Sequence, residues 1–371
     1  MRPEIAEAKI LVIKIGSALL LDEDRLDHDW LHALADDIGR LRAEGRKIII
    51  VTSGAVSLGC AALGLQRDAL SLAESQAAAA NGQIALLRGW QEALGTHGLQ
   101  TAQILLTAED TEQRRRYLNA RQTIYALLDI GAVPVINEND TVATQELRYG
   151  DNDRLAARVA AMVSADGLVL LSDIDGLYSA NPHEDDSAQF IDRIETVTAE
   201  IEAMAGGSGS SHGSGGMVTK LQAAQIAQSA GCHMILASGR GLHPLSALQN
   251  GARSSLFVAH DTPLTARKNW IAHTLHPAGR LHMDAGAMAA LRDGKSLLPV
   301  GVTQIDGDFE RGDCVALLAA DGHEIGRGLV ALASDDARLM MGKASHARDD
   351  ILDAKARAEI VHRDDMVLNE I

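Results

Sequence analysis

The sequence predicts an α/β protein with a mainly parallel open sheet sandwiched by helices, followed by a small C-terminal β-barrel-like domain. Two observations predict this fold class. Up to residue 239, short apolar runs alternate with longer segments of helical periodicity, an alternation typical of a parallel sheet covered on both faces. After residue 276 the segments become short and turn signals lie close together, which indicates a compact β module.

Apolar runs typical of buried strands lie at residues 9–16, 47–54, 100–107, 132–140, 166–173 and 233–239. Segments with apolar residues at helical spacing lie between them, at residues 29–45, 71–94, 110–131, 153–165 and 217–231. A Gly- and Ser-rich stretch at residues 206–216 is expected to be a mobile loop inside the first domain, because the α/β pattern resumes directly after it. The predicted limits are residues 1–265 for the first domain, 266–276 for a linker and 277–371 for the second domain.

Composition excludes several classes of protein. Hydrophobic residues make up 46% of the 371 residues and aromatic residues only 3%, so the cores are expected to consist of Ala, Leu, Ile and Val. The formal net charge of −16 disfavours non-specific binding to nucleic acid or to an anionic membrane. Three scattered cysteines without a CxxC pair indicate neither a zinc site nor a disulfide framework. We expect a cytoplasmic protein, since the sequence shows no signal peptide and no apolar run of the ~18 residues that a membrane helix needs.

Two neighbouring segments are rich in Asn and Asp. The segment INENDTV at residues 136–142 contributes Asn137 and Asp140, and GDNDRLAA at residues 150–157 contributes Asp151, Asn152 and Asp153. In an open parallel sheet, ligands bind beyond the carboxyl ends of the strands, where these residues are expected to lie. A helix cap accounts for one such residue, not for five. Carboxylates and amides at this edge indicate a substrate with an ammonium group and hydrogen-bonding oxygens.

Three Gly-containing turns are candidate anion sites. In VIKIGSALL, Lys14 ends a strand before Gly16 and can serve a phosphate, or it is an ordinary lysine at a strand end. In VTSGAVSLG, Ser53 precedes a helix start that favours a carboxylate or phosphate, or it is a plain N-cap. In GSGGMVTK, flexible backbone precedes Lys220, which suits nucleotide phosphates or a solvated linker.

Taken in order, the motifs KIGS, VTSGA, PVINEND, GDND with LAA, LVLLSD with DGLY, and GGM with TK resemble the amino acid kinase family. Within that family they are most similar to the branch that phosphorylates glutamate. The likeness covers essentially the whole chain. The C-terminal segment resembles the PUA module, including VHRDDMVL at residues 361–368. The resemblance therefore implies the amino acid kinase fold followed by a PUA domain.

The resemblance implies a reaction in which ATP and L-glutamate give ADP and L-glutamyl 5-phosphate, the first step of proline biosynthesis. It places glutamate against Ser53, Asn137, Asp140, Asp151 and Asn152. It places ATP against Lys14, Gly16, Ser172, Asp173, Ser214, Gly215, Gly216, Met217 and Lys220. Ser172 and Ser214 stand where the family commonly has Thr, so the hydroxyl group is kept.

The chemistry of this reaction agrees with the residue types. A γ-carboxylate has a pKa of about 4.3 and is ionised at pH 7, so no general base is needed. Catalysis is then positioning and charge neutralisation, for which Lys14 and Lys220 are the catalytic candidates. Mg²⁺ is expected to be held mainly by the ATP phosphates, with no protein ligand predicted. Asp153 is expected to orient the lysines or to act through Mg²⁺, and Asp140 to face the α-ammonium group.

Other readings remain open at this point. Aspartate, N-acetylglutamate, carbamate and UMP kinases share the fold, although an acetylated amine needs no carboxylate such as Asp140 and a nucleoside monophosphate calls for basic residues. PUA modules elsewhere bind RNA. From residue 277 onward, however, 11 Lys and Arg face 17 Asp and Glu, a net charge of −6, which disfavours phosphate binding and favours a stability or assembly module.

The resemblance also implies partners that composition does not indicate. These are proline as a feedback inhibitor at the glutamate site and a homo-oligomer, a dimer or tetramer. Hand-over of the labile product to glutamyl phosphate reductase is a further expectation. Neither nucleic acid nor a membrane is expected as a partner.

Overall fold

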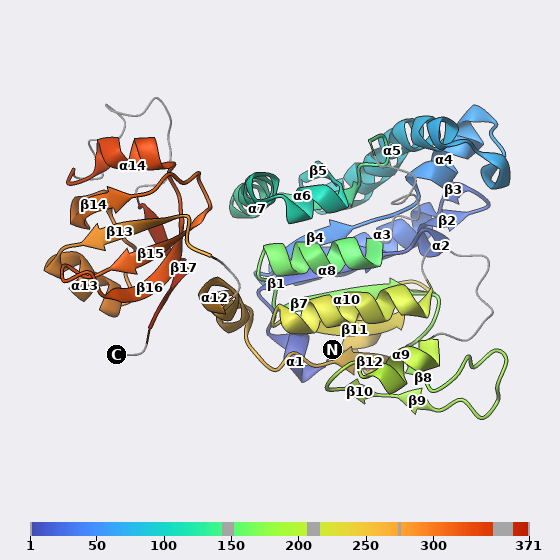
Figure 1. Cartoon of the computed structure of the whole chain (residues 1–371). Helices are drawn as coiled ribbons and strands as arrows, with labels where there is room; N and C mark the ends of the chain where they lie inside the picture. Colours follow the sequence, from blue (N-terminus) through green and yellow to red (C-terminus); the bar gives the residue numbers. More distant parts are fainter. Residues whose placement is uncertain (1, 143–151, 206–215, 274–275, 344–358, 370–371) are drawn as a thin grey trace. The chain divides into compact units, whose positions relative to one another are not determined.

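The computed structural model describes residues 2–142, 152–205, 216–273, 276–343 and 359–369. These residues form two compact units, Met1–Pro263 and Leu264–Ile371 (Figure 1). Each unit contains its own sheet and its own buried core. The domain limits predicted from the sequence, residues 1–265 and 277–371, stay a prediction.

The first unit is built on an eight-stranded sheet with the order β10-β12-β11-β7-β1-β4-β6-β5. Its strands are β1 (Ile10–Ile15), β4 (Lys47–Val51), β5 (Thr101–Leu106), β6 (Val133–Glu138), β7 (Gly167–Ser172), β10 (Arg193–Ile194), β11 (His233–Ser238) and β12 (Ser254–Phe257). From β11 to β5 every neighbouring pair is parallel, and β12 pairs antiparallel with β11. The predicted mainly parallel sheet is confirmed.

Helices cover both faces of this sheet. One face packs against α3 (His28–Ala43), α4 (Ala55–Leu63), α5 (Leu72–Gly95) and α11 (Pro244–Gln249). The other packs against α7 (Arg114–Asp129), α8 (Asn152–Met162) and α10 (Met217–Ser229), and Figure 1 shows α8 and α10 side by side on that face. Strand side chains alternate between faces, so Leu11 and Ile13 enter the first core and Val12 the second. The same alternation directs Lys14 toward α8 and α10.

One predicted helix is wrong in its extent. The segment 110–131 was expected to be a single helix, but it forms α6 (Ala108–Glu112) and α7, separated at Gln113. Gln113 has φ −72° and ψ 119°, an extended conformation that ends one helix and precedes the next. A capping box between Thr107 and Asp110 starts α6 earlier than predicted.

Short elements complete the first unit. They are α1 (Pro3–Ala6), α2 (Ser17–Leu20), β2 (Leu21–Asp22), β3 (Arg25–Leu26), η1 (Arg67–Ala69), β8 (Leu177–Tyr178), β9 (Phe190–Ile191) and α9 (Ala199–Ala205). The expected mobile loop at residues 206–216 lies outside the described residues except for Gly216.

The second unit contains a five-stranded sheet with the order β14-β13-β15-β16-β17. Its elements are β13 (Gly279–Met283), α13 (Ala285–Arg292), η3 (Pro299–Gly301), β14 (Val302–Asp306), β15 (Cys314–Leu318), β16 (Glu324–Val330), α14 (Ser334–Met340) and β17 (Val361–Leu368). Strand β17 coincides with the motif at residues 361–368. The residues predicted as a linker, 266–276, overlap helix α12 (Pro263–His273), where Arg267 forms a 2.8 Å ion pair with Asp365.

None of the helices in the described part of the chain is both long enough and apolar enough to cross a membrane.

Candidate active site

The predicted site residues converge at one edge of the first sheet. Strands β1, β4, β6 and β7 are neighbours or near neighbours and run parallel, so their carboxyl ends share one edge. Lys14 lies at the end of β1, Asn137 at the end of β6 and Ser172 at the end of β7. Ser53 lies two residues beyond the end of β4. Helices α8 and α10 begin with Asn152 and Met217, so six segments of the chain supply the site.

Asp153 lies between two lysines in the first turn of α8. Its Oδ1 forms an ion pair with Lys14 Nζ, and its Oδ2 lies 3.3 Å from Lys220 Nζ. Thr219 Oγ1 also donates to Asp153 Oδ2, at 3.2 Å. Asp153 is 0% exposed, Lys14 8% and Lys220 6%. The structure thus brings together the three residues predicted to be catalytic.

The charges of this cluster are set by one another. Burial by itself would raise the pKa of Asp153, but the two nearby ammonium groups outweigh burial and hold its pKa below the usual carboxyl value. The carboxylate therefore stays ionised, and it holds Lys14 Nζ at one of its oxygens and Lys220 Nζ at the other. Two cations held at the carboxyl edge of a parallel sheet are suited to a polyphosphate.

The start of α10 adds a second feature that suits an anion. Gly216 precedes the helix in extended conformation and no side chain caps it, so main-chain N–H groups of the first turn are directed outward. Met217 is half-buried beside it. The predicted nucleotide residues Ser214 and Gly215 lie outside the described residues.

The other predicted nucleotide contacts lie at the neighbouring strand ends. Ser172 is buried at the end of β7, and its hydroxyl donates to Asp173 Oδ1 at 3.0 Å. Asp173 is exposed. Gly16 follows β1, and a Cβ added there would lie 3.9 Å from Lys14 Nζ. Lys14 Nζ and the Gly16 turn are therefore neighbours at this strand end.

Amides rather than charges dominate the side of the site near β4 and β6. Asn152 Nδ2 lies 2.7 Å from the Thr52 carbonyl oxygen, 2.7 Å from Ser53 Oγ and 2.9 Å from Asn137 Oδ1. Within the part of the chain that the structure describes, Asn152 Oδ1 is buried and has no hydrogen-bond partner. An unpartnered buried oxygen is costly, and an ammonium group fits it. The predicted Asp151 lies outside the described residues.

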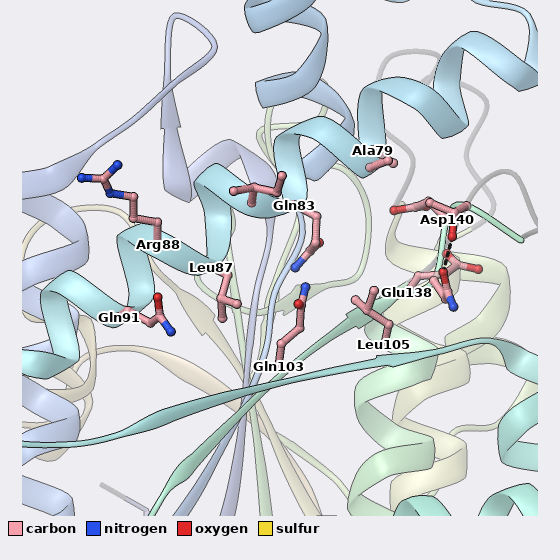
Figure 2. Close-up of a pocket in the computed structure, with 13 residues that line it drawn as sticks. Ala79, Gln83, Leu87, Arg88, Gln91, Gln103, Leu105, Glu138 and Asp140 are labelled. Atoms are coloured by element: carbon pink, nitrogen blue, oxygen red, sulfur yellow. Dashed lines mark hydrogen bonds between the residues drawn. The ribbon is translucent and has the colours of Figure 1, made fainter.

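Asp140 follows β6 in a different environment from Asp153. Burial raises its pKa to about 6. It lines a cavity of about 500 Å³ between α5 and the strands β5 and β6, together with Gln83, Gln103, Leu105 and Glu138 (Figure 2). Burial makes the ionised form of a carboxylate less stable, so the binding of a cation beside it is especially favourable.

Close backbone contacts hold α5 against this side of the site. A Cβ added to Gly82 would lie 1.9 Å from the carbonyl oxygen of Ala55, so only glycine permits α5 to cross α4 this closely. Gln83, the next residue on α5, lies beside Asn137, whose Nδ2 donates to Gln83 Oε1 at 2.7 Å. Seven residues later on the same helical face, Trp90 Nε1 donates to Thr52 Oγ1 at 3.3 Å.

The sequence reading missed three contributors. Thr219 lies inside the GGM-TK motif and contacts Asp153. Thr52 contributes its main-chain carbonyl, which no side-chain pattern reveals. Gln83 lies within an Ala-rich helix. In the sequence, its signal is a polar residue seven positions before Trp90, and the structure shows that it is buried.

The described residues contain no cluster of three or more His, Cys, Asp or Glu side chains that could hold a metal ion. Both carboxylate oxygens of Asp153 already face lysines. Among the described residues, Asp153 therefore offers the lysines, rather than a metal ion, its two oxygens.

The chain is similar to two known families and to several named relatives. Residues 9–238 match the amino acid kinase family and residues 279–352 match the PUA domain. The chain is 57% identical to a glutamate 5-kinase of Agrobacterium fabrum over 368 residues, covering 99% of this chain and 95% of the relative. It is 57% identical to glutamate 5-kinase 1 of Rhizobium meliloti, covering 99% and 94%. A glutamate 5-kinase of Paramagnetospirillum magneticum is 54% identical, with 98% and 99% covered.

Proposed function

This chain belongs to the amino acid kinase family, and we propose from that premise that it phosphorylates the γ-carboxylate of L-glutamate with ATP. The products are ADP and L-glutamyl 5-phosphate, the first intermediate of proline biosynthesis. The observation that carries the proposal is the buried Asp153 between Lys14 and Lys220, beside an amide-rich acceptor side. Relatives named glutamate 5-kinase, aligned over nearly the whole chain, support the choice of glutamate.

The reaction needs positioning rather than proton removal. A γ-carboxylate oxygen of glutamate forms a bond to the γ-phosphorus of ATP, and the bond from that phosphorus to the β–γ bridging oxygen breaks. The electron pair leaves with ADP, and no proton moves, because the acceptor is already ionised at pH 7. The obstacle is the approach of one anion to another, which Lys14 and Lys220 reduce by neutralising charge on the transferred group. Asp153 positions the two lysines.

On the nucleotide side, we assign Gly16, Ser172, Asp173, Gly216 and Met217 to ATP. Their support is their place at the strand ends and at the uncapped start of α10. Mg²⁺ accompanies ATP, and we assign its ligands to the phosphates because the described residues offer no cluster for it. When bound, the ion supplies further neutralisation of phosphate charge.

On the acceptor side, we assign Ser53, Asn137, Asp140 and Asn152 to glutamate. Asp140 faces the α-ammonium group, supported by its raised pKa of about 6 in a site without a paired cation among the described residues. Asn152 Oδ1 is a further acceptor for the same group. These contacts fix the amino-acid end and leave the γ-carboxylate directed toward Lys14 and Lys220.

We extend the proposal to the inhibitor, the assembly, the partner and the location of the enzyme. Proline inhibits at the glutamate site, the chain assembles as a homo-oligomer of two or four copies, and glutamyl phosphate reductase receives the labile acyl phosphate. A cytoplasmic location is supported by three buried cysteines, which form no disulfide within the described residues. The negative charge from residue 277 onward supports an assembly or stability role for the PUA domain over nucleic-acid binding.

The test is product formation in the presence of hydroxylamine, which converts an acyl phosphate into a hydroxamate. Wild-type protein is supplied with Mg-ATP and, in parallel, L-glutamate, L-aspartate, N-acetylglutamate or UMP. The proposal predicts hydroxamate and matching ADP release with glutamate. Turnover with another acceptor and none with glutamate would contradict it and would overturn the assignments of Asp140 and Asn152.

A further inference from the structure

Three buried amide side chains form a continuous hydrogen-bonded chain beneath the acceptor side. Asn152 Nδ2 donates to the Thr52 carbonyl oxygen at 2.7 Å and to Asn137 Oδ1 at 2.9 Å. Asn137 Nδ2 donates to Gln83 Oε1 at 2.7 Å. Asn152, Asn137 and Gln83 are 7%, 2% and 8% exposed, so a lost partner would leave a polar atom buried without compensation.

The Thr52 carbonyl sets the direction of this amide chain. A carbonyl oxygen only accepts hydrogen bonds, so Asn152 has to turn Nδ2 toward it. Asn137 then has to offer Oδ1 to Asn152, and its Nδ2 faces away from Asn152. Only an acceptor fits that Nδ2, and Gln83 Oε1 is that acceptor. Turning Asn137 alone would place two N–H groups against each other.

We propose that Gln83 is a positioning residue for the amino-acid acceptor. By accepting from Asn137 Nδ2, Gln83 holds Asn137 in place, and Asn137 together with the Thr52 carbonyl holds Asn152 in the one orientation that leaves Asn152 Oδ1 available. That oxygen, buried and unpartnered among the described residues, then accepts from the α-ammonium group of the substrate. The inference rests on the proposed function, and it assigns a role to a residue on α5 that does not touch the substrate itself.

The amide chain has no alternative arrangement if the acceptor at position 83 is lost. Asn137 Nδ2 would become a buried donor without a partner, a state that costs about 1–3 kcal/mol. Asn137 cannot relieve this by turning its amide, because Asn152 is fixed by Thr52. It has to leave its position, and Asn152 Nδ2 then loses Asn137 Oδ1 as an acceptor, keeping the Thr52 carbonyl oxygen and Ser53 Oγ. The ion pairs of Asp153 are made by other groups, so the nucleotide side is expected to remain intact.

The experiment compares three variants of the full chain. Gln83→Met keeps the length of the side chain and removes the acceptor, whereas Gln83→Glu keeps an acceptor oxygen for Asn137. Gln91→Met is the matched control, since Gln91 lies on the same helix and lines the same cavity (Figure 2) but is no part of the amide chain. Should Gln83→Met fail to fold, Gln83→Asn replaces it, because the shorter amide does not reach Asn137.

The steady-state constants of the hydroxamate assay give the readout. We expect Gln83→Met, or Gln83→Asn, to raise KM for glutamate about tenfold or more, with kcat and KM for ATP changed by less than about twofold. Gln83→Glu and Gln91→Met are expected to keep KM for glutamate within about threefold of wild type. An equal rise with Gln83→Met and Gln83→Glu, or no rise with Gln83→Met, would overturn the inference.

A double-mutant cycle with Asn137 separates positioning from general structural damage. Once Asn137→Ala has removed the donor, Gln83→Met should raise KM for glutamate no further. Additive effects of the two substitutions would show that Gln83 acts by another route and would overturn the inference. If wild-type protein forms no hydroxamate from glutamate, the proposed function fails first. If wild type is active and only the Gln83 results disagree, the inference alone fails.

Discussion

Two carboxylates at the same edge of the sheet differ in what the protein provides for them. Asp153 is buried between Lys14 and Lys220, and their charges hold its pKa below the usual value. Asp140 has no ion pair with a cation in the described part of the chain, and burial raises its pKa to about 6. Within the described residues, the cluster proposed to serve the nucleotide thus has paired charges. On the side proposed for the acceptor, the same residues offer no hydrogen-bond donor to Asn152 Oδ1.

This difference assigns separate roles to the two sides. A cluster whose charges are already paired is preorganised, and it acts on charge that develops at the phosphoryl group during transfer. A side with unsatisfied acceptors gains free energy when a cationic group arrives, which is ground-state binding. Substitutions on the nucleotide side should therefore lower kcat, and substitutions on the acceptor side should raise KM for glutamate.

The largest effect is expected from Asp153→Ala. Removing this carboxylate takes away the counter-ion that two buried ammonium groups share, which costs about 3–5 kcal/mol of the free energy of unfolding and also abolishes their positioning. Urea denaturation and the hydroxamate assay measure the two losses. Because the folded-state pKa of Asp153 is lowered, its contribution is present above the unfolded pKa of about 3.9 and is lost as pH falls through the folded value. Unchanged stability and kcat would disprove the preorganised cluster.

Lys14→Ala and Lys220→Ala are expected to lower kcat by about 100-fold or more each, through lost neutralisation in the transition state. Initial rates at saturating ATP and glutamate give the value, and circular dichroism checks the fold. A variant with near-normal kcat would remove that lysine from the mechanism.

Asp140→Ala should raise KM for glutamate by about 10- to 100-fold, the loss of a partly buried charge-assisted contact, with a smaller change in kcat. Lys268→Ala, in the second unit, serves as a control for removal of a charge elsewhere. Loss of kcat alone in Asp140→Ala would contradict the assignment of this residue to the ammonium group.

The raised pKa of Asp140 predicts a pH dependence specific to the acceptor side. In free enzyme the carboxylate is protonated below about pH 6, so kcat/KM for glutamate should fall about tenfold per pH unit there. The sign for stability is opposite to that of Asp153. A raised carboxyl pKa favours the folded state at low pH, and this contribution is lost as pH rises from about 4 to about 6. A profile flat down to pH 5 would contradict the environment assigned to Asp140.

The smallest effect is expected from Ser172→Thr. The hydroxyl that donates to Asp173 is kept, and one methyl group is added at a buried strand end. KM for ATP should change by less than about threefold. Ser172→Ala, which removes the hydroxyl, is the contrasting variant and should raise KM for ATP further than Ser172→Thr does.

Much of the first sheet could be predicted because its strands are buried on both faces and read as continuous apolar runs, as in residues 166–173. The break at Gln113 could not, because it depends on backbone dihedral angles inside a segment with helical composition. Motifs located Lys14, Asp153 and Lys220, and residue chemistry suggested their grouping. That Asp153 is fully buried between the lysines is a tertiary fact that no spacing contains.

The acceptor side shows the limit of sequence reading more clearly. Asn137 and Asn152 lie in motifs, but their partners are a main-chain carbonyl at Thr52 and an amide on α5. Gln83 reaches the site only because Gly82 allows α5 to cross α4 closely. Such contributions depend on helix packing between distant segments, so they cannot be predicted from the pattern of residue types along the chain.

We propose that one set of residues binds the acceptor and a separate set neutralises the charge of the phosphoryl group. This proposal is tested most directly by isothermal titration of glutamate, without nucleotide turnover, into wild type, Lys14→Ala and Asp140→Ala. We expect Lys14→Ala, although nearly inactive, to bind glutamate within about threefold of wild type, and Asp140→Ala to bind it at least about tenfold more weakly. Equal loss of glutamate binding in both variants would contradict the separation.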